Sequence, residues 1–216
     1  MGLDWNPANK PVPGREKEYE ALLAALEADA ENDDEESDEE SEASRQFFAA
    51  TISAFETLEA PTIGVDEIAN DWAKEQYDAG EKTEPYDAWF EKVRGLRLVH
   101  LVPACSGVPR YSNGSPAGYV EPFSFRAQFL TLCEDIIGPE VLEKCYESKS
   151  PGELVDFGKC LKSAGEEYAA AQGVSIPPES EEFDENAPEW RADILVAAGE
   201  WCIFWGERGH PLDAYW

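Results

Sequence analysis

The strongest local constraint on the fold is a helix-start signal at Ser150-Pro151-Gly152-Glu153. Ser at the N-cap, Pro at the first helical position and Glu three residues after the N-cap form a capping box, which satisfies backbone N–H groups at the start of a helix. Apolar residues then recur three and four positions apart as far as Ala171, and Gly173 follows as a stop signal. The pattern predicts one long helix with a single apolar face turned towards a bundle core.

Helical spacing of apolar residues, bounded by Gly, Pro and capping residues, predicts several further helices. They begin at about Glu16, after Asp66, after Pro85, at about Pro122 (as far as Ile137) and at Pro139. Two segments leave alternatives open. Residues 45–57 are helical throughout or turn extended after Ala50, and residues 190–205 form a helix or a hairpin that turns at 198–200.

One stretch, Leu96 to Pro103, has the Leu and β-branched content of a strand and ends in a proline. On such a strand His100 would share a face with Leu96, Leu98 and Val102, which predicts that it points into the core. The sequence as a whole therefore predicts a mainly α protein with a minor β part. We expect a single-domain helical bundle of about six to seven helices, with one short strand or hairpin near residues 96–103.

Negative charge is the extreme property of this chain, which has 46 acidic and 17 basic residues and a formal net charge of −29. Phosphate backbones repel a chain of this charge, so direct nucleic-acid binding is not expected. No apolar run approaches the roughly 18 residues that a membrane span needs, so no membrane association is expected either.

The acidic residues are concentrated in part of the chain. Eleven of them lie between Glu27 and Glu42 with no basic residue among them. Because such a segment repels itself and offers nothing to bury, we expect a disordered acidic insert at about 30–44. A second stretch, rich in proline and acidic residues, predicts a long surface loop at about 176–188. Both would belong to one globular domain spanning residues 1–216.

The five cysteines are spaced at least twelve residues apart, so the chain has no Cys-x-x-Cys pair. This spacing argues against a zinc ribbon, a thioredoxin-type motif or a disulfide scaffold. The first residues have neither the basic segment nor the apolar run of a secretion signal. We therefore expect a cytoplasmic protein without a metal site or a cofactor.

The region most typical of a binding site is a Gly-, Pro- and Ser-rich loop at about 104–119 with the residues that flank it. Loops of this length in a compact domain are often functional, and their glycines allow the backbone to approach a ligand closely. Arginines, rare in this chain, would hold a small anionic ligand there. The candidate ligand-binding residues are His100, Cys105, Arg110, Tyr111, Asn113, Tyr119, Glu121 and Arg126.

Two other interpretations of this region stay open. It is a surface loop held by its own aromatic residues, with Arg126 paired to a nearby acid, or it contains a catalytic pair in which His100 activates Cys105. For the whole chain, charge favours a non-catalytic acidic interaction module that binds a basic protein partner, as inhibitors, immunity proteins and accessory subunits do. The alternatives are a small-ligand-binding protein or a cysteine-dependent enzyme that uses the loop at 100–126.

Overall fold

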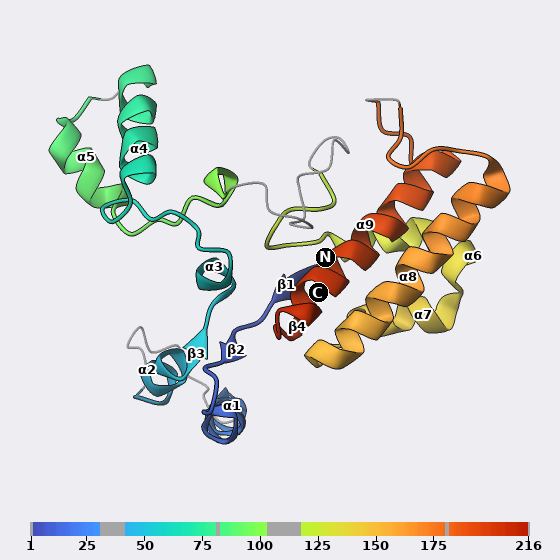
Figure 1. Ribbon diagram of the computed structural model, residues 1–216, viewed down its shortest axis with the longest axis horizontal. Helices are drawn as coiled ribbons and strands as arrows, with labels where there is room; N and C mark the ends of the chain where they lie inside the picture. Colours follow the sequence, from blue (N-terminus) through green and yellow to red (C-terminus); the bar gives the residue numbers. More distant parts are fainter. Residues whose placement is uncertain (1, 31–41, 81–82, 103–117, 180–181, 216) are drawn as a thin grey trace. The chain divides into compact units, whose positions relative to one another are not determined.

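The computed structural model describes residues 2–30, 42–80, 83–102, 118–179 and 182–215. Within these ranges the chain forms nine α-helices, three 3-10 turns and two two-stranded sheets (Figure 1), which confirms a mainly α fold with a minor β part. Contacts divide the chain into a main unit, residues 1–54 and 107–216, and an inserted unit, residues 55–106. That the two units act as one domain stays a prediction.

The main unit is built on two long helices, α8 (Pro151–Gln172) and α9 (Pro188–Glu207), which lie side by side (Figure 1). The predicted capping box is present: the backbone N–H of Ser150 donates to Glu153 Oε2 at 3.0 Å. Gly173 ends α8 in the left-handed conformation, with φ of 67°. Residues 190–205 are helical, which settles the alternative between a helix and a hairpin.

Glycines bring the backbones of α8 and α9 into direct contact. A Cβ atom added to Gly199 would lie 2.5 Å from the carbonyl oxygen of Gly158, and one added to Gly158 would lie 2.7 Å from that of Gly199. For Gly165 and Gly206 the nearest backbone oxygens of the other helix would lie 2.9 and 2.7 Å away. Any larger residue at these positions would force the helices apart.

An aromatic core fills the space beside these helices. Trp5, Phe125, Trp201 and Trp205 are all fully buried. The ring of Trp5 lies 5.3 Å from that of Phe125 and 6.2 Å from that of Trp201, and its Nε1–H donates to the carbonyl oxygen of Cys145 at 2.7 Å. A residue near the N-terminus is thus held by segments from the C-terminal half of the chain.

Two small antiparallel sheets complete this arrangement. Strand β1 (Asp4–Pro7) pairs with β4 (Leu212–Tyr215), and β2 (Lys10–Pro11) pairs with β3 (Thr51–Ile52). Because β3 follows directly on Ala50, the chain turns extended after that residue, which was one of the two alternatives for residues 45–57.

Buried His210 joins the terminal segments. Its Nδ1–H donates to the carbonyl oxygen of Ala8 at 2.8 Å, and its ring lies edge-on to Trp205 at 5.1 Å. Burial lowers its pKa to about 4, and the nearby positive charges of Lys10 and Arg208 act in the same direction. The folded protein therefore holds this imidazole in its neutral form at neutral pH.

The N-terminal part of the main unit contains α1 (Glu16–Ala30) and α2 (Glu42–Ala49), and α3 (Ala54–Thr57) begins at its boundary with the inserted unit. The acidic insert expected at about 30–44 stays a prediction; residue 30 is the last of α1, and residues 42–44 are the first of α2. Glu42 accepts hydrogen bonds from Arg45 at 2.8 Å and Gln46 at 2.9 Å, pairs that favour a helix start. Residues 31–41 lie outside the described part of the chain.

The helix expected from Pro122 to Ile137 begins later and is mostly 3-10. The structure has η2 (Ala127–Cys133) followed by α6 (Glu134–Ile137), then α7 (Pro139–Glu143) and η3 (Lys144–Tyr146). The delay has a physical cause: the backbones of Phe125 and Arg126 are hydrogen-bonded to Trp5 and Tyr119 instead of to a helical turn. In the expected loop at 176–188, the described residues before α9 contain neither helix nor strand.

After α3, the inserted unit contains α4 (Glu67–Ala79), α5 (Tyr86–Val93) and η1 (Val99–Leu101). Its core cluster is formed by the buried residues Ile63, Ala69, Ala73 and Leu98, with partly buried aromatic residues packed around them. Asp66 occupies the predicted N-cap position of α4. Its carboxylate accepts a hydrogen bond from the backbone N–H of Thr62 at 2.7 Å, rather than from the helix.

The strand predicted at residues 96–103 is wrong. The described part of this segment has one isolated bridge, between Thr62 and Arg97, and then the 3-10 turn η1. The segment that pairs with residues 96–98 contains Pro61, whose carbonyl oxygen accepts from the N–H of Leu98. Because proline has no N–H, it cannot donate the next hydrogen bond of a strand pair. Leu98 and Leu101, three residues apart, both pack on the small core instead.

The core position predicted for His100 is also wrong, because His100 is exposed. Its ring packs on that of Trp72, with 5.0 Å between ring centroids. The turn at η1 replaces the alternation of a strand, so His100 does not share a face with Leu98.

Replacing Gly199 by Ala tests the contact between α8 and α9. We expect Gly199→Ala to lower the free energy of unfolding by about 1–3 kcal/mol, because the new methyl group overlaps the backbone of Gly158. Gly152→Ala is the matched control, since a Cβ there meets no atom within 4 Å; it should raise the free energy by about 0.5–1 kcal/mol. Urea unfolding followed by far-UV circular dichroism measures both. Equal stability of the two variants would contradict the contact.

His210 predicts a specific pH dependence. Its pKa is lower in the folded state than its usual value near 6.5, so the unfolded state takes up the proton first as the pH falls. The stabilisation that comes from keeping His210 neutral should be fully present above pH 6.5. Its loss should decrease the free energy of unfolding by about 2 kcal/mol between pH 7 and 5. Urea unfolding at these pH values should show this loss in the wild type and a smaller one in His210→Gln. A loss of the same size in His210→Gln would contradict the assignment of this pH dependence to His210.

Candidate functional site

Three of the eight candidate residues, Tyr119, Glu121 and Arg126, lie in one segment of the main unit. This segment folds back on itself: the N–H of Arg126 donates to the carbonyl oxygen of Tyr119, and that of Glu121 donates to the carbonyl oxygen of Ser124, both at 2.8 Å. The turn brings the two ends of the segment together. His100 lies in the inserted unit, and Cys105, Arg110, Tyr111 and Asn113 lie outside the described residues, so their part in a site stays a prediction.

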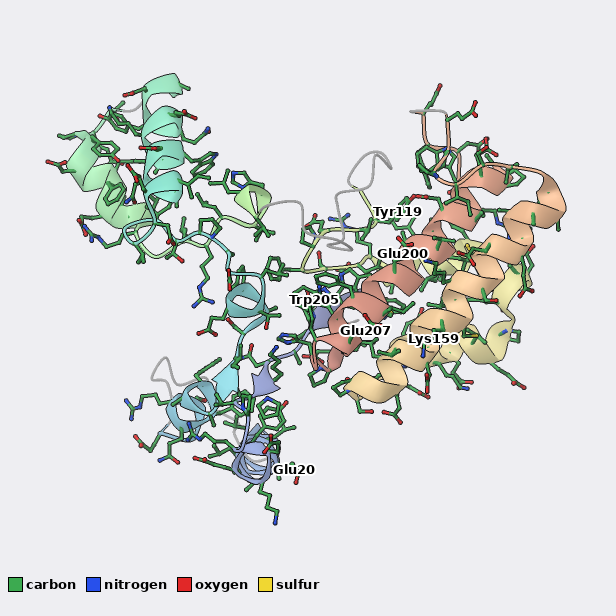
Figure 2. All side chains as sticks on the ribbon, viewed as in Figure 1. Glu20, Tyr119, Lys159, Glu200, Trp205 and Glu207 are labelled. Carbon is green, nitrogen blue, oxygen red and sulfur yellow. The ribbon has the colours of Figure 1, made fainter. Side chains whose placement is uncertain are left out.

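Tyr119 points into the core. Its side chain is fully buried, and its hydroxyl donates to the carboxylate of Asp193 on α9 (Tyr119 is labelled in Figure 2). Burial raises the pKa of both groups, and for Tyr119 the nearby carboxylate adds to the effect. This hydrogen bond fixes the start of the segment to the long helix pair.

An aromatic cluster extends from Tyr119 to the loop that precedes α9. The Tyr119 ring lies 5.6 Å from that of Phe129 and 6.5 Å from that of Phe183. Phe183 in turn lies 5.7 Å from Phe129 and 5.3 Å from Trp190. Packing of this kind holds the loop at 182–187 against the body of the main unit.

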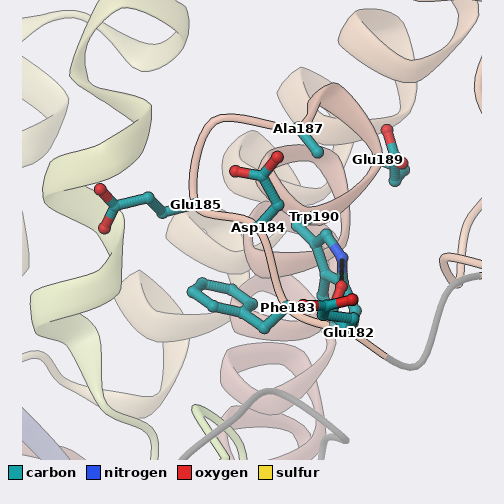
Figure 3. Close-up of a pocket in the computed structure, with 7 residues that line it drawn as sticks. All are labelled: Glu182, Phe183, Asp184, Glu185, Ala187, Glu189 and Trp190. Atoms are coloured by element: carbon teal, nitrogen blue, oxygen red, sulfur yellow. Dashed lines mark hydrogen bonds between the residues drawn. The ribbon is translucent and has the colours of Figure 1, made fainter.

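The loop and the first turn of α9 line an open pocket of about 660 Å³, which we call the acidic-aromatic pocket (Figure 3). It is lined by Glu182, Phe183, Asp184, Glu185, Ala187, Glu189 and Trp190. The N–H of Asn186 donates to Asp184 Oδ1 at 2.9 Å, and Trp190 Nε1–H donates to the carbonyl oxygen of Glu182 at 3.0 Å. Four carboxylates and two aromatic residues thus line the acidic-aromatic pocket. No basic residue is among the described residues that line it.

A second pocket, of about 470 Å³, contains the candidate residue Arg126, and we call it the Arg126 pocket. It is lined by Gly2, Asp4, Arg126, Gln128, Phe129, Thr131, Leu132 and Glu185. Glu185 lines both pockets, and in Figure 3 its side chain extends to the side opposite Glu189. The two pockets therefore flank the same loop.

The sequence prediction included Arg126 but missed most residues of these pockets. The acids and the aromatic residue of the loop were visible as a Glu-Phe-Asp-Glu run at 182–185, which was interpreted only as surface loop. No sequence pattern indicated that Asp4 belongs to a binding site. Its position beside Arg126 arises from the pairing of Trp5 with Phe125, which are far apart in the sequence.

None of the described cysteines is among the residues that line the two pockets. Cys133, Cys145 and Cys202 are buried, and burial raises the pKa of each thiol, to about 12 for Cys133 and Cys145. Cys160 on α8 is exposed. Within the described ranges, no group of three or more His, Cys, Asp or Glu residues is arranged to hold a metal ion.

No family model, no curated protein and no solved structure matches this chain. Among the helices described, none combines the length and the apolar character needed to cross a membrane. Inference about function therefore begins from the residues of the two pockets and from the charge of the chain.

Thiol labelling tests the burial of the cysteines. Treatment of the native protein with iodoacetamide should modify Cys160 and leave Cys133, Cys145 and Cys202 unmodified, because the thiolate is the reactive form and burial disfavours it. Peptide mass spectrometry locates the modified residues, and labelling in urea is the positive control. Rapid labelling of Cys133 or Cys202 in the native state would contradict the structure.

Proposed function

We propose that this chain is a non-catalytic acidic interaction module that binds a basic protein partner through the acidic-aromatic pocket. The observation that carries the proposal is the lining of that pocket, which combines four carboxylates with the partly exposed ring of Phe183 and the buried ring of Trp190. A lysine or arginine side chain of the partner is the group that fits this lining.

The chemistry of the lining explains the preference for a cation. An ammonium or guanidinium group placed over an aromatic ring gains about 0.5–2 kcal/mol, and the effect is larger when the group is partly desolvated. Carboxylates around the rings add charge-assisted hydrogen bonds to the same group. An arginine satisfies both at once, because its planar guanidinium stacks on a ring and presents several N–H donors to carboxylates.

Long-range charge supports the same partner. With a net charge of −29, the chain attracts a basic protein surface from a distance, which raises the rate of association and disfavours acidic partners. The four described cysteines are free thiols, in keeping with the reducing cytoplasm that we propose as its compartment. Burial disfavours the nucleophilic thiolate of three of them, and Cys105, the cysteine of the catalytic alternative, lies outside the described residues.

The proposal is tested by affinity capture from cells of the source organism with matched variants. The double variant Glu182→Gln/Glu189→Gln removes two charges from the acidic-aromatic pocket. The control Glu140→Gln/Glu143→Gln removes two charges from exposed positions on α7, so that the net charge is the same. We expect the wild type and the control to retain a stoichiometric protein of basic isoelectric point, and the pocket variant to lose it.

Salt provides a second criterion in the same experiment. Raising the ionic strength from about 0.1 M to about 1 M shortens the screening length from about 10 Å to about 3 Å, so the partner should be released. Failure to recover a basic protein at low salt, or equal recovery by the pocket variant and the control, would reject the proposal.

A further inference from the structure

The Arg126 pocket is built on a pair of backbone segments far apart in the sequence. Trp5 and Phe125 exchange hydrogen bonds, with N–H to carbonyl oxygen distances of 2.8 and 3.0 Å, and the N–H of Gln128 donates to the carbonyl oxygen of Leu3 at 3.0 Å. The two bonds between Trp5 and Phe125 are those of an antiparallel bridge, in which the residues on either side of each bonded residue point to the opposite face.

The alternation places two opposite charges on the outer face. Trp5 and Phe125 point inwards and are fully buried, whereas their neighbours Asp4 and Arg126 are exposed. Residues opposite each other next to a hydrogen-bonded pair have Cβ atoms about 4.5–5.5 Å apart. Asp4 and Arg126 are therefore cross-strand neighbours, fixed by the backbone rather than by contact between their own side chains.

Backbone hydrogen bonds fix the position of Arg126, and the packing of Phe183 fixes the loop that carries Glu185. The N–H of Arg126 donates to the carbonyl oxygen of Tyr119 at 2.8 Å, and its own carbonyl oxygen accepts from Phe129 N–H at 3.1 Å. Glu185 follows Phe183, which is packed in the aromatic cluster. The positions of all three charges thus depend on core residues.

These three charges line one cavity without neutralising one another. In the described part of the chain, no salt bridge includes Arg126, Asp4 or Glu185. A purely anionic ligand would be repelled by the two carboxylates, and a purely cationic one would leave the guanidinium unpaired. A ligand that carries both charges is complementary to the pocket.

The other residues that line the pocket indicate the size and polarity of the rest of the ligand. Phe129 and Leu132 are apolar, and Gln128 and Thr131 carry polar side chains. A volume of about 470 Å³ lies in the range of about 300–1,000 Å³ that is usual for small-molecule sites. We infer that the Arg126 pocket binds a small zwitterion, an α-amino acid with an apolar side chain, whose carboxylate meets Arg126 and whose ammonium group meets Asp4 and Glu185.

Isothermal titration of the full-length protein with three related compounds tests this inference. The probes are L-phenylalanine, phenylalaninamide, which lacks the carboxylate, and N-acetylphenylalanine, which lacks the ammonium group. L-Phenylalanine should bind, and each analogue should bind at least about tenfold more weakly, because each leaves a charged group of the pocket unpaired. This comparison uses the wild-type protein and does not depend on whether a variant folds.

Variants assign the binding to the pocket. Arg126→Gln and Asp4→Asn should each weaken L-phenylalanine binding at least about tenfold. Lys159→Gln and Asp156→Asn make the same charge changes at exposed positions on α8 and should leave binding unchanged. The variant Glu182→Gln/Glu189→Gln should also bind normally, which separates this inference from the proposed protein partner.

Several results would overturn the inference. One is the absence of binding by L-phenylalanine and L-leucine at millimolar concentration. Another is phenylalaninamide binding as tightly as phenylalanine, which would indicate a cation site. A third is unchanged binding by a folded Arg126→Gln variant, which would place the ligand elsewhere.

Discussion

Close approach of α8 and α9 is the constraint on which the main unit depends. Gly158, Gly165, Gly199 and Gly206 leave no side chain between the two backbones at their contact points. The large residues of α9 are consequently directed to the other sides of the helix, where Trp201 and Trp205 form the aromatic core. A pair of helices separated by side chains of ordinary size would leave that core with a different shape, because interiors are closely packed.

Both pockets follow from what packs on this helix pair. Trp5 enters the aromatic core, and its backbone pairing with Phe125 brings Asp4 beside Arg126. Tyr119 is tied to α9 through Asp193, and its ring begins the aromatic cluster that holds the loop at 182–187. Buried aromatic residues therefore fix the positions of these exposed charges. The geometry of both pockets depends on packing in the core as well as on the surface residues.

Local sequence signals predicted the parts of the fold that depend on local energetics. The capping box at Ser150 and the left-handed glycine at Gly173 set the ends of α8 as expected, because both act within one helical turn. The segment at 96–103 was mispredicted because a strand needs a partner, and Pro61 in the neighbouring segment cannot continue a ladder. Non-local pairing is likewise why Asp4 was missed and Arg126 was predicted without its neighbours.

The order in which the chain is synthesised has a consequence for Trp5. The core cluster of the inserted unit (Ile63, Ala69, Ala73 and Leu98) lies within about 35 residues of sequence, so all of it is present soon after this part of the chain leaves the ribosome. Trp5, by contrast, packs on Trp201, nearly two hundred residues later. At about 5–20 residues per second, β1 spends roughly 10–40 seconds without the residues that bury it. During that interval the indole of Trp5 is exposed and its backbone is unpaired, so this segment is open to chaperones and to neighbouring chains on the same message.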